Sequence, residues 1–225
     1  MTINKSFGFL CVNFFILTSF VLAKGEPSFS DSVETLLSDS NINSSRLKAT
    51  IALENSGDPK AVSYLILALK DKSYPYRFAA IHALGVLGSD EAVNFLEHRW
   101  RELECKKTQG NIKSESTSKI SEKAYIAAAL CKLGKDSHVQ YLYNAIESTE
   151  KTVRYNVAMS LGMVSNKKSK EILYKILKND SADLPRCGAA FALVELNDPD
   201  IIDTLRLMER NGKGTTCFNS LVQNE

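Results

Sequence analysis

The sequence predicts an all-α fold: an α-α superhelical solenoid of about five helical hairpins, preceded by an N-terminal capping helix. Two observations lead to this prediction. The first is a near copy, because residues 76–88 read YRFAAIHALGVLG and residues 153–165 read VRYNVAMSLGMVS. The second is that similar residues recur at fixed distances along most of the chain. A period of roughly 20–50 residues is typical of proteins built from stacked structural repeats.

The repeats align on a basic anchor residue that precedes an alanine-rich run. The anchors are Arg46, Arg77, Lys123, Arg154 and Arg186, separated by 31, 46, 31 and 32 residues. Seven residues after each anchor is a leucine: Leu53, Leu84, Leu130, Leu161 and Leu193. Nineteen residues after each anchor is another: Leu65, Leu96, Leu142, Leu173 and Leu205. These two leucine columns indicate two buried helices in each repeat.

The first helix of each repeat, helix A, is expected to run for about eleven residues from its anchor. At that distance come Gly57, Gly88, Gly134, Ser165 and Asn197. The glycines and the asparagine suit a left-handed helix end. Helix B then carries apolar residues three and four apart, such as Val62, Leu65 and Leu69. Residues 31–38 have the pattern of a lone helix B, and we expect them to cap the first hairpin. A single hairpin cannot bury its apolar stripe, so successive copies are predicted to pack on one another.

These units resemble HEAT repeats, specifically the short kind described as PBS-lyase HEAT-like repeats. The pattern is most complete in residues 69–96, LKDKSYPYRFAAIHALGVLGSDEAVNFL, and the resemblance covers nearly all of residues 46–210. It implies the all-α solenoid. It does not imply one function, because scaffolds, adaptors, lyases and regulators all contain such units.

The N-terminal residues are typical of a secretory signal peptide. Lys5 precedes a mostly apolar run from Phe7 to Leu22, and Val21 and Ala23 suit a cleavage site after residue 23. We expect cleavage there, with an uncleaved membrane anchor as the alternative, and an exported protein that is periplasmic or secreted. Without residues 1–23 the net charge is about +1, so the composition indicates no nucleic-acid partner.

The predicted organisation after the signal peptide has five parts. They are a linker and capping helix (24–45), repeats one and two (46–102), a polar insertion loop (103–118), repeats three to five (119–210) and a C-terminal tail (211–225). The insertion is either a tolerated surface loop or a second binding element, since loops on rigid scaffolds often carry function.

Four cysteines remain after signal cleavage, which permits disulfides in an exported protein. Helix B of the last repeat returns antiparallel to helix A, and a short tail would then bring Cys217 back to Cys187. Cys105 and Cys131 are left as a second candidate pair. The alternative is four separate thiols.

No residues form a recognised catalytic, cofactor or metal site. The histidines form no recognised set of metal ligands, and no cysteine pair forms a CxxC motif. The HEAT-like deoxyhypusine hydroxylases bind iron through His-Glu dipeptides, but this chain has the reverse order at Glu97 and His98. We therefore predict neither an enzyme nor a bound cofactor.

The expected binding surface is a row on the B helices, which we predict to line the concave side of the solenoid. Positions 20 and 21 after the anchors supply its candidate residues: Ile66, Leu67, Glu97, His98, Tyr143, Asn144, Tyr174, Lys175 and Arg206. Tyrosine and arginine are favoured at binding hot spots. The alternative is that half of these residues pack against the adjacent repeat.

The function that fits best is an exported, non-catalytic scaffold or adaptor that binds another protein or a peptide segment. One alternative is a chromophore-attachment factor or other enzyme, by analogy with the bilin lyases of the repeat family. Another is a structural module of the cell envelope. The sequence does not indicate the oligomeric state.

Overall fold

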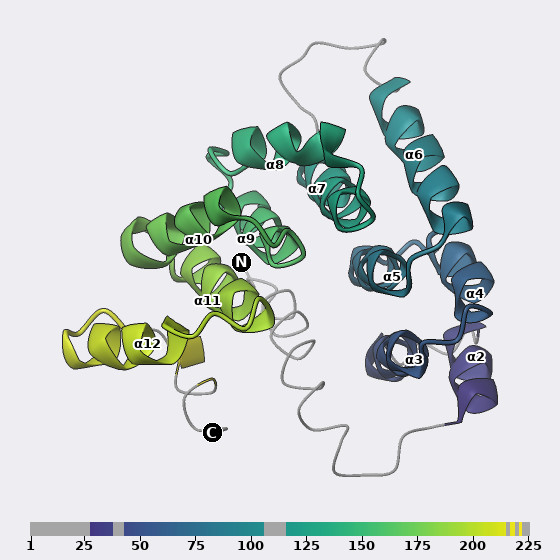
Figure 1. Ribbon diagram of the computed structural model, residues 1–225, viewed down its shortest axis with the longest axis horizontal. Coiled ribbons are helices and arrows are strands. Elements are labelled where there is room, and N and C mark those ends of the chain that lie inside the picture. Colours follow the sequence, from purple (N-terminus) through teal and green to yellow (C-terminus); the bar gives the residue numbers. More distant parts are fainter. Residues whose placement is uncertain (1–27, 38–42, 106–115, 215–216, 219–220, 222–225) are drawn as a thin grey trace, which may run out of the picture. The chain divides into compact units, whose positions relative to one another are not determined.

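The computed structural model describes residues 28–37, 43–105, 116–214, 217–218 and 221, without the side chains of residues 43, 44 and 105. The predicted signal peptide lies outside these residues. Within them the chain forms eleven α-helices, α2 to α12, and a short 3-10 helix, η1, with no strand (Figure 1). None of these helices is both long and apolar enough to cross a membrane. The all-α prediction is therefore confirmed for the described residues.

The chain divides into two compact units, residues 1–114 and 115–225. Unit 1 contains α2 (Phe29–Leu37), α3 (Asn43–Ser56), α4 (Ala61–Ala68), α5 (Tyr74–Leu87) and α6 (Asp90–Cys105). Unit 2 contains α7 (Thr117–Lys132), η1 (Asp136–His138), α8 (Val139–Ala145), α9 (Lys151–Leu161), α10 (Lys167–Asn179), α11 (Asp183–Glu195) and α12 (Ile201–Arg210).

The predicted insertion loop is shorter in the structure than residues 103–118. Helix α6 continues to Cys105 because Leu103 is buried on its inner face, and α7 already begins at Thr117. Residues 106–115 lie outside the described part of the chain.

The five predicted hairpins are present as α3–α4, α5–α6, α7–α8, α9–α10 and α11–α12. Helix α2 packs against α3 and α4, as expected of a cap. Gly57, Gly88, Gly134 and Asn197 have φ values between 50° and 81°, so four helices A end as predicted. Ser165 does not follow the pattern, because α9 ends earlier, at Leu161.

The helices A begin before their anchors, contrary to the expected start. Four of them begin three residues earlier, and α7 begins six residues before Lys123. In α5 the early start is favoured by Pro75 in the first turn, where a missing N–H costs nothing.

The two leucine columns form the core of the hairpins. All ten leucines are 0% exposed. Each full burial of a leucine side chain contributes about 2 kcal/mol to folding, so the columns are the main repeated source of stability. This confirms the central prediction from the sequence.

Within unit 2 the A helices lie closer together than the B helices. Helix α9 packs against both α7 and α11. A Cβ atom on Gly188 of α11 would lie 2.9 Å from Cδ2 of Tyr155 and 3.0 Å from its carbonyl oxygen in α9, so only glycine fits there. Helices α8, α10 and α12 instead fan outward (Figure 1). The prediction that B helices line a concave side is therefore wrong for unit 2, because small residues draw the A helices together.

Candidate functional site: a groove between two B helices

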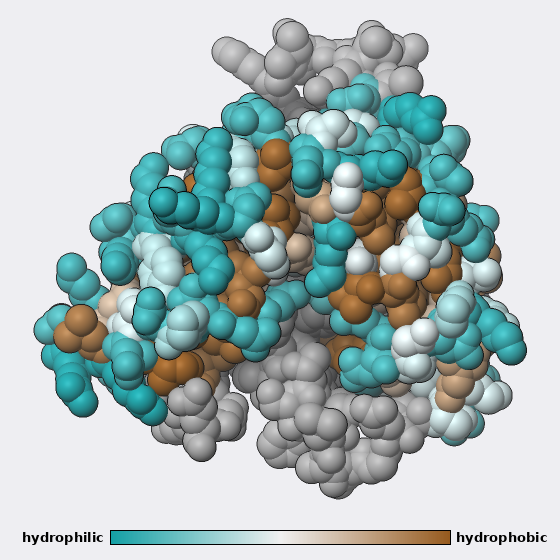
Figure 2. Space-filling view, viewed as in Figure 1, coloured by the Kyte–Doolittle hydropathy of each residue, from teal (hydrophilic) through white to brown (hydrophobic). Residues whose placement is uncertain are grey.

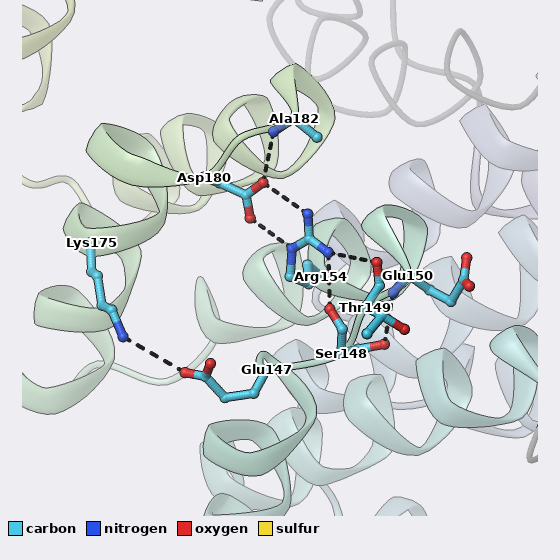
Figure 3. A network of polar contacts seen from close by, with 8 residues as sticks. All are labelled: Glu147, Ser148, Thr149, Glu150, Arg154, Lys175, Asp180 and Ala182. Carbon is cyan, nitrogen blue, oxygen red and sulfur yellow. Dashed lines mark hydrogen bonds and ion pairs between the residues drawn. The ribbon is translucent and has the colours of Figure 1, made fainter. Parts of the chain in front are cut away.

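The anchor arginines of the first and fourth repeats, Arg46 and Arg154, hold their hairpins closed. In the fourth repeat, Nε and Nη2 of Arg154 donate to the two carboxylate oxygens of Asp180 at 2.7 and 2.9 Å (Figure 3). Its Nη1 donates to the carbonyl oxygens of Ser148 and Thr149 at 2.9 and 3.0 Å. In the first repeat, Arg46 Nη2 pairs with Asp71 Oδ2, and Arg46 Nε donates to the Leu36 carbonyl. Arg46 and Arg154 thus join the start of helix A to the end of helix B in the same hairpin.

Asp180 is tuned to remain ionised. Burial raises the pKa of its carboxyl group, but hydrogen bonds from the Arg154 side chain and the Ala182 N–H, together with the charges of Arg154 and Arg186, outweigh that effect. The result is a pKa below the usual value. A stable anion is therefore held beside the guanidinium at the base of the B-helix surface.

A groove of about 540 Å³ separates α8 from α10, and we refer to it as the B groove. Its α8 side includes Gln140, Tyr143, Ile146 and Glu147, and its α10 side includes Lys168, Ile172, Lys175 and Ile176. The Arg154–Asp180 pair also lines it. Ile146 and Ile176 are buried, whereas Ile172 is half-buried. The groove therefore combines an apolar floor with charged rims.

The rims carry ammonium groups that are weakly held. Lys175 Nζ lies 3.7 Å from Glu147 Oε1 across the groove, with both side chains more than 70% exposed (Figure 3). Lys168 Nζ lies 4.1 Å from the centre of the Tyr143 ring. Exposed ion pairs of this kind contribute about 0–1 kcal/mol, so an incoming ligand can replace them at little cost.

Figure 2 shows mostly hydrophilic residues over α10 and α12, with hydrophobic residues in small patches. The face of these helices in this view is thus mainly hydrophilic.

The two predicted hot-spot tyrosines join neighbouring repeats. The Tyr174 hydroxyl donates to Asp198 Oδ1 at 2.7 Å, in the turn that precedes α12. The Tyr143 hydroxyl accepts from Asn166 Nδ2 at 3.2 Å, at the start of α10. Both side chains leave one B helix and reach the beginning of the next. The expected alternative, packing against the adjacent repeat, therefore describes these two residues, although Tyr143 also lines the groove.

The other predicted binding residues remain scattered on their helices. In α4, Ile66 is half-buried and Leu67 is 46% exposed. In α6, Glu97 is half-buried, while His98 is exposed and lies 3.9 Å from Glu102.

In unit 2, only Tyr143 and Lys175 of the predicted residues line the B groove. Asn144 accepts a hydrogen bond from Gln140 at 2.9 Å, and Arg206 lies 3.4 Å from Asp203. The sequence reasoning missed Lys168, Ile172 and Ile176, which share one face of α10 at helical spacing.

One of the two predicted disulfides is present. Cys187 and Cys217 are bonded, with Cα atoms 6.0 Å apart, so the tail returns to the start of α11 as expected. Cys131 is a free, buried thiol, so the predicted Cys105–Cys131 bond is not formed. Burial, and then the nearby charge of Asp136, raises the pKa of Cys131 to about 11. The Cys131 thiol is therefore protonated at neutral pH and is a poor nucleophile.

Among the described residues, no three or more His, Cys, Asp or Glu side chains are grouped to hold a metal ion. His82 has a structural contact instead, since its Nδ1 lies 3.0 Å from Glu54 Oε2 on the preceding helix A.

The family comparison agrees with this architecture. The HEAT-repeat family matches residues 31–104 and 114–194, which is more than half of the chain. The chain belongs to the HEAT-repeat family. No curated protein sequence matches it.

Two solved structures are also similar to this chain. The complex of CpcE and CpcF of phycocyanin lyase from Nostoc sp. PCC7120 has a chain that is 16% identical, with a TM-score of 0.51 and coverage of 98% of this chain and 89% of that chain. Human deoxyhypusine hydroxylase in complex with glycerol is 13% identical, with a TM-score of 0.37 and coverage of 92% and 96%. At 16% identity, the likeness to the chain of the CpcE–CpcF complex concerns the fold alone.

Proposed function

We propose that this HEAT-repeat protein is an exported, non-catalytic adaptor that binds another protein through the B groove. The observation that supports this most is the groove itself. Its apolar floor and exposed charged rims are the combination found at protein-binding surfaces, where a buried centre is surrounded by polar residues. The arrangement is rigid, because the groove walls are helices whose A partners are closely packed.

The proposal departs from the row of residues expected from the sequence. The Tyr174 hydroxyl is hydrogen-bonded to Asp198, so we assign Tyr174 to the contact between neighbouring repeats and not to the surface that binds another protein. The proposed contact surface consists of Tyr143, Lys168, Ile172 and Lys175. The structural likeness to a chain of the CpcE–CpcF complex is compatible with protein binding, because that chain is itself part of a protein complex.

Site-specific crosslinking in the native host tests the adaptor proposal. A photoreactive amino acid replaces Ile172 or Lys175 in the groove, and Lys167, which is 91% exposed on the same helix, provides the matched control. We expect one protein to crosslink from both groove positions and not from the control. The purified partner should then bind the purified chain saturably. Equal crosslinking from all three positions, or none, would refute the proposed surface.

Export is proposed from the N-terminal sequence pattern and is supported by the Cys187–Cys217 bond, since disulfides persist in oxidising compartments. Cell fractionation followed by N-terminal sequencing tests it. We expect the chain in the periplasm or medium, beginning at Lys24. A cytoplasmic chain that retains residues 1–23 would contradict export.

The two alternatives from the sequence have separate tests. A chromophore-attachment role requires saturable binding and a colour change on titration with a bilin. A purely structural envelope role requires self-association, which analytical sedimentation measures. Either result would count against the adaptor proposal.

A further inference from the structure

The charges around the B groove indicate what kind of segment it binds. Helix α10 carries five lysines and one acidic residue, whereas α8 carries no charged residue. Lys170 is already engaged, because its Nζ lies 2.9 Å from Asp198. Lys168 and Lys175 face the groove, where Asp180 is already satisfied by Arg154. The acid left on the rim is Glu147, which holds Lys175 only weakly.

From this surplus of cations we infer that the B groove binds an acidic segment of another protein, in extended conformation. The inference rests on the proposed adaptor function. Carboxylates of the segment contact Lys168 and Lys175, and an apolar side chain between them packs on Ile172. The Glu147 carboxylate competes with the segment for Lys175.

The spacing of the groove residues sets the spacing of the partner residues. Lys168, Ile172 and Lys175 stand at i, i+4 and i+7, on one face of α10. Seven residues of helix rise by roughly 10 Å. An extended segment in the polyproline II conformation covers that distance in about three residues, and residues three positions apart lie on the same side of it. The segment that fits therefore has two acidic residues three positions apart, with an aliphatic residue between them.

The probe is a fluorescent eight-residue peptide in which two glutamates three positions apart flank leucine and valine. Its control has glutamines in place of the glutamates. Fluorescence anisotropy with the purified chain should show saturable binding of the acidic peptide and at least about tenfold weaker binding of the control. Raising the salt concentration should weaken the acidic peptide, because the charges are exposed and are screened.

Substitutions on the chain give effects of opposite sign, which a folding defect cannot produce. The double variant Lys168→Glu, Lys175→Glu should bind the acidic peptide about tenfold more weakly, since two exposed attractions become repulsions. Glu147→Gln should bind it about two- to threefold more tightly, because a competing carboxylate is removed. Lys167→Glu, on the same helix but outside the groove, should bind like the unchanged chain. Circular dichroism verifies that each variant is folded.

Each outcome decides the inference. Tighter binding by Glu147→Gln together with weaker binding by the double variant supports it. Equal binding of both peptides, no saturable binding, or an equal loss in Lys167→Glu overturns it. The proposed adaptor function fails separately, if no partner crosslinks at the groove. A crosslinked partner whose affinity does not change with salt concentration or with these substitutions would overturn the inference of an acidic segment, but not the proposed adaptor function.

Discussion

Replacing Tyr174 with phenylalanine should destabilise the fold far more than the same change at Tyr143. The Tyr174 hydroxyl donates to Asp198 at 2.7 Å, and the Asp198 side chain is only 8% exposed. A hydrogen bond to a charged group contributes about 1.5–3 kcal/mol. Asp198 keeps Lys170 and the Asp200 N–H as partners, so its charge is not left alone. We therefore expect a loss near the lower limit, about 1.5 kcal/mol in the free energy of unfolding.

Tyr143→Phe is the matched control, because Tyr143 occupies the same repeat position on α8. Its hydroxyl lies 3.2 Å from Asn166 Nδ2 and 3.5 Å from Ser169 Oγ, and the contact with Asn166 is exposed to solvent. We expect a loss of about 0.5 kcal/mol or less. Urea denaturation followed by far-ultraviolet circular dichroism measures both values. Similar slopes against urea would show that the two variants unfold to comparable states.

The pH dependence provides an independent check on Tyr174. Burial raises the pKa of Asp198, but hydrogen bonds from Lys170, Tyr174 and the Asp200 N–H outweigh that effect. The pKa of Asp198 therefore lies below its usual value. A carboxyl whose pKa is lowered on folding stabilises the protein above its unfolded pKa, and this stability is lost as the pH falls through its folded pKa. The difference between the unchanged chain and Tyr174→Phe should thus be present at neutral pH and shrink below about pH 4. Equal losses in the two variants at pH 7, or a difference that grows in acid, would refute the assignment of Tyr174 as a structural joint.

Three further predictions concern the chemistry of unit 2. Reducing the Cys187–Cys217 bond, which closes a separation of 30 residues, should lower the free energy of unfolding by about 3–4 kcal/mol, measured by urea denaturation with and without reductant; an unchanged midpoint would contradict it. Asp180→Asn should lower the free energy of unfolding at pH 7, and the difference from the unchanged chain should shrink below about pH 4. The pKa of Asp180 is lowered in the folded chain, so the stability that its carboxylate contributes is lost in acid; a difference that stays constant with pH would contradict this. Cys131 should react with a thiol reagent at pH 8 much more slowly in the native than in the urea-unfolded chain, since its pKa is raised to about 11; equal rates would show that the thiol is accessible.

The fold was predictable because the repeat pattern records burial directly. A leucine that recurs at the same place in five copies predicts the same environment five times, and each of these leucines is fully buried. Glycine and asparagine at the helix ends predicted the left-handed residues equally well. These signals are local, since each depends on one hairpin and on its immediate neighbour.

The binding surface was harder to predict because it depends on how one repeat is rotated against the next. Position in the repeat shows which face a side chain leaves, but not what the next repeat places opposite it. The sequence therefore predicted Tyr174 and Tyr143 as binding residues. In the structure their hydroxyl groups are hydrogen-bonded to residues just before the following B helix. The groove likewise depends on the separation of α8 from α10. The sequence could have predicted one part of the groove, because the helical spacing of Lys168, Ile172 and Lys175 places them on one face of α10.

The same small residues that stabilise unit 2 also open its groove. Gly188 and the fully buried alanines of α9 and α11 let these helices touch at backbone distance, so the A side has no room to close further. Large side chains occupy the B side, where α8 and α10 meet chiefly through polar contacts of Tyr143, Lys168 and Lys175. Contacts of this kind are weak and exchange readily with a ligand. The core therefore fixes the width of the groove, while the rim residues that recognise a partner can change without disturbing the core.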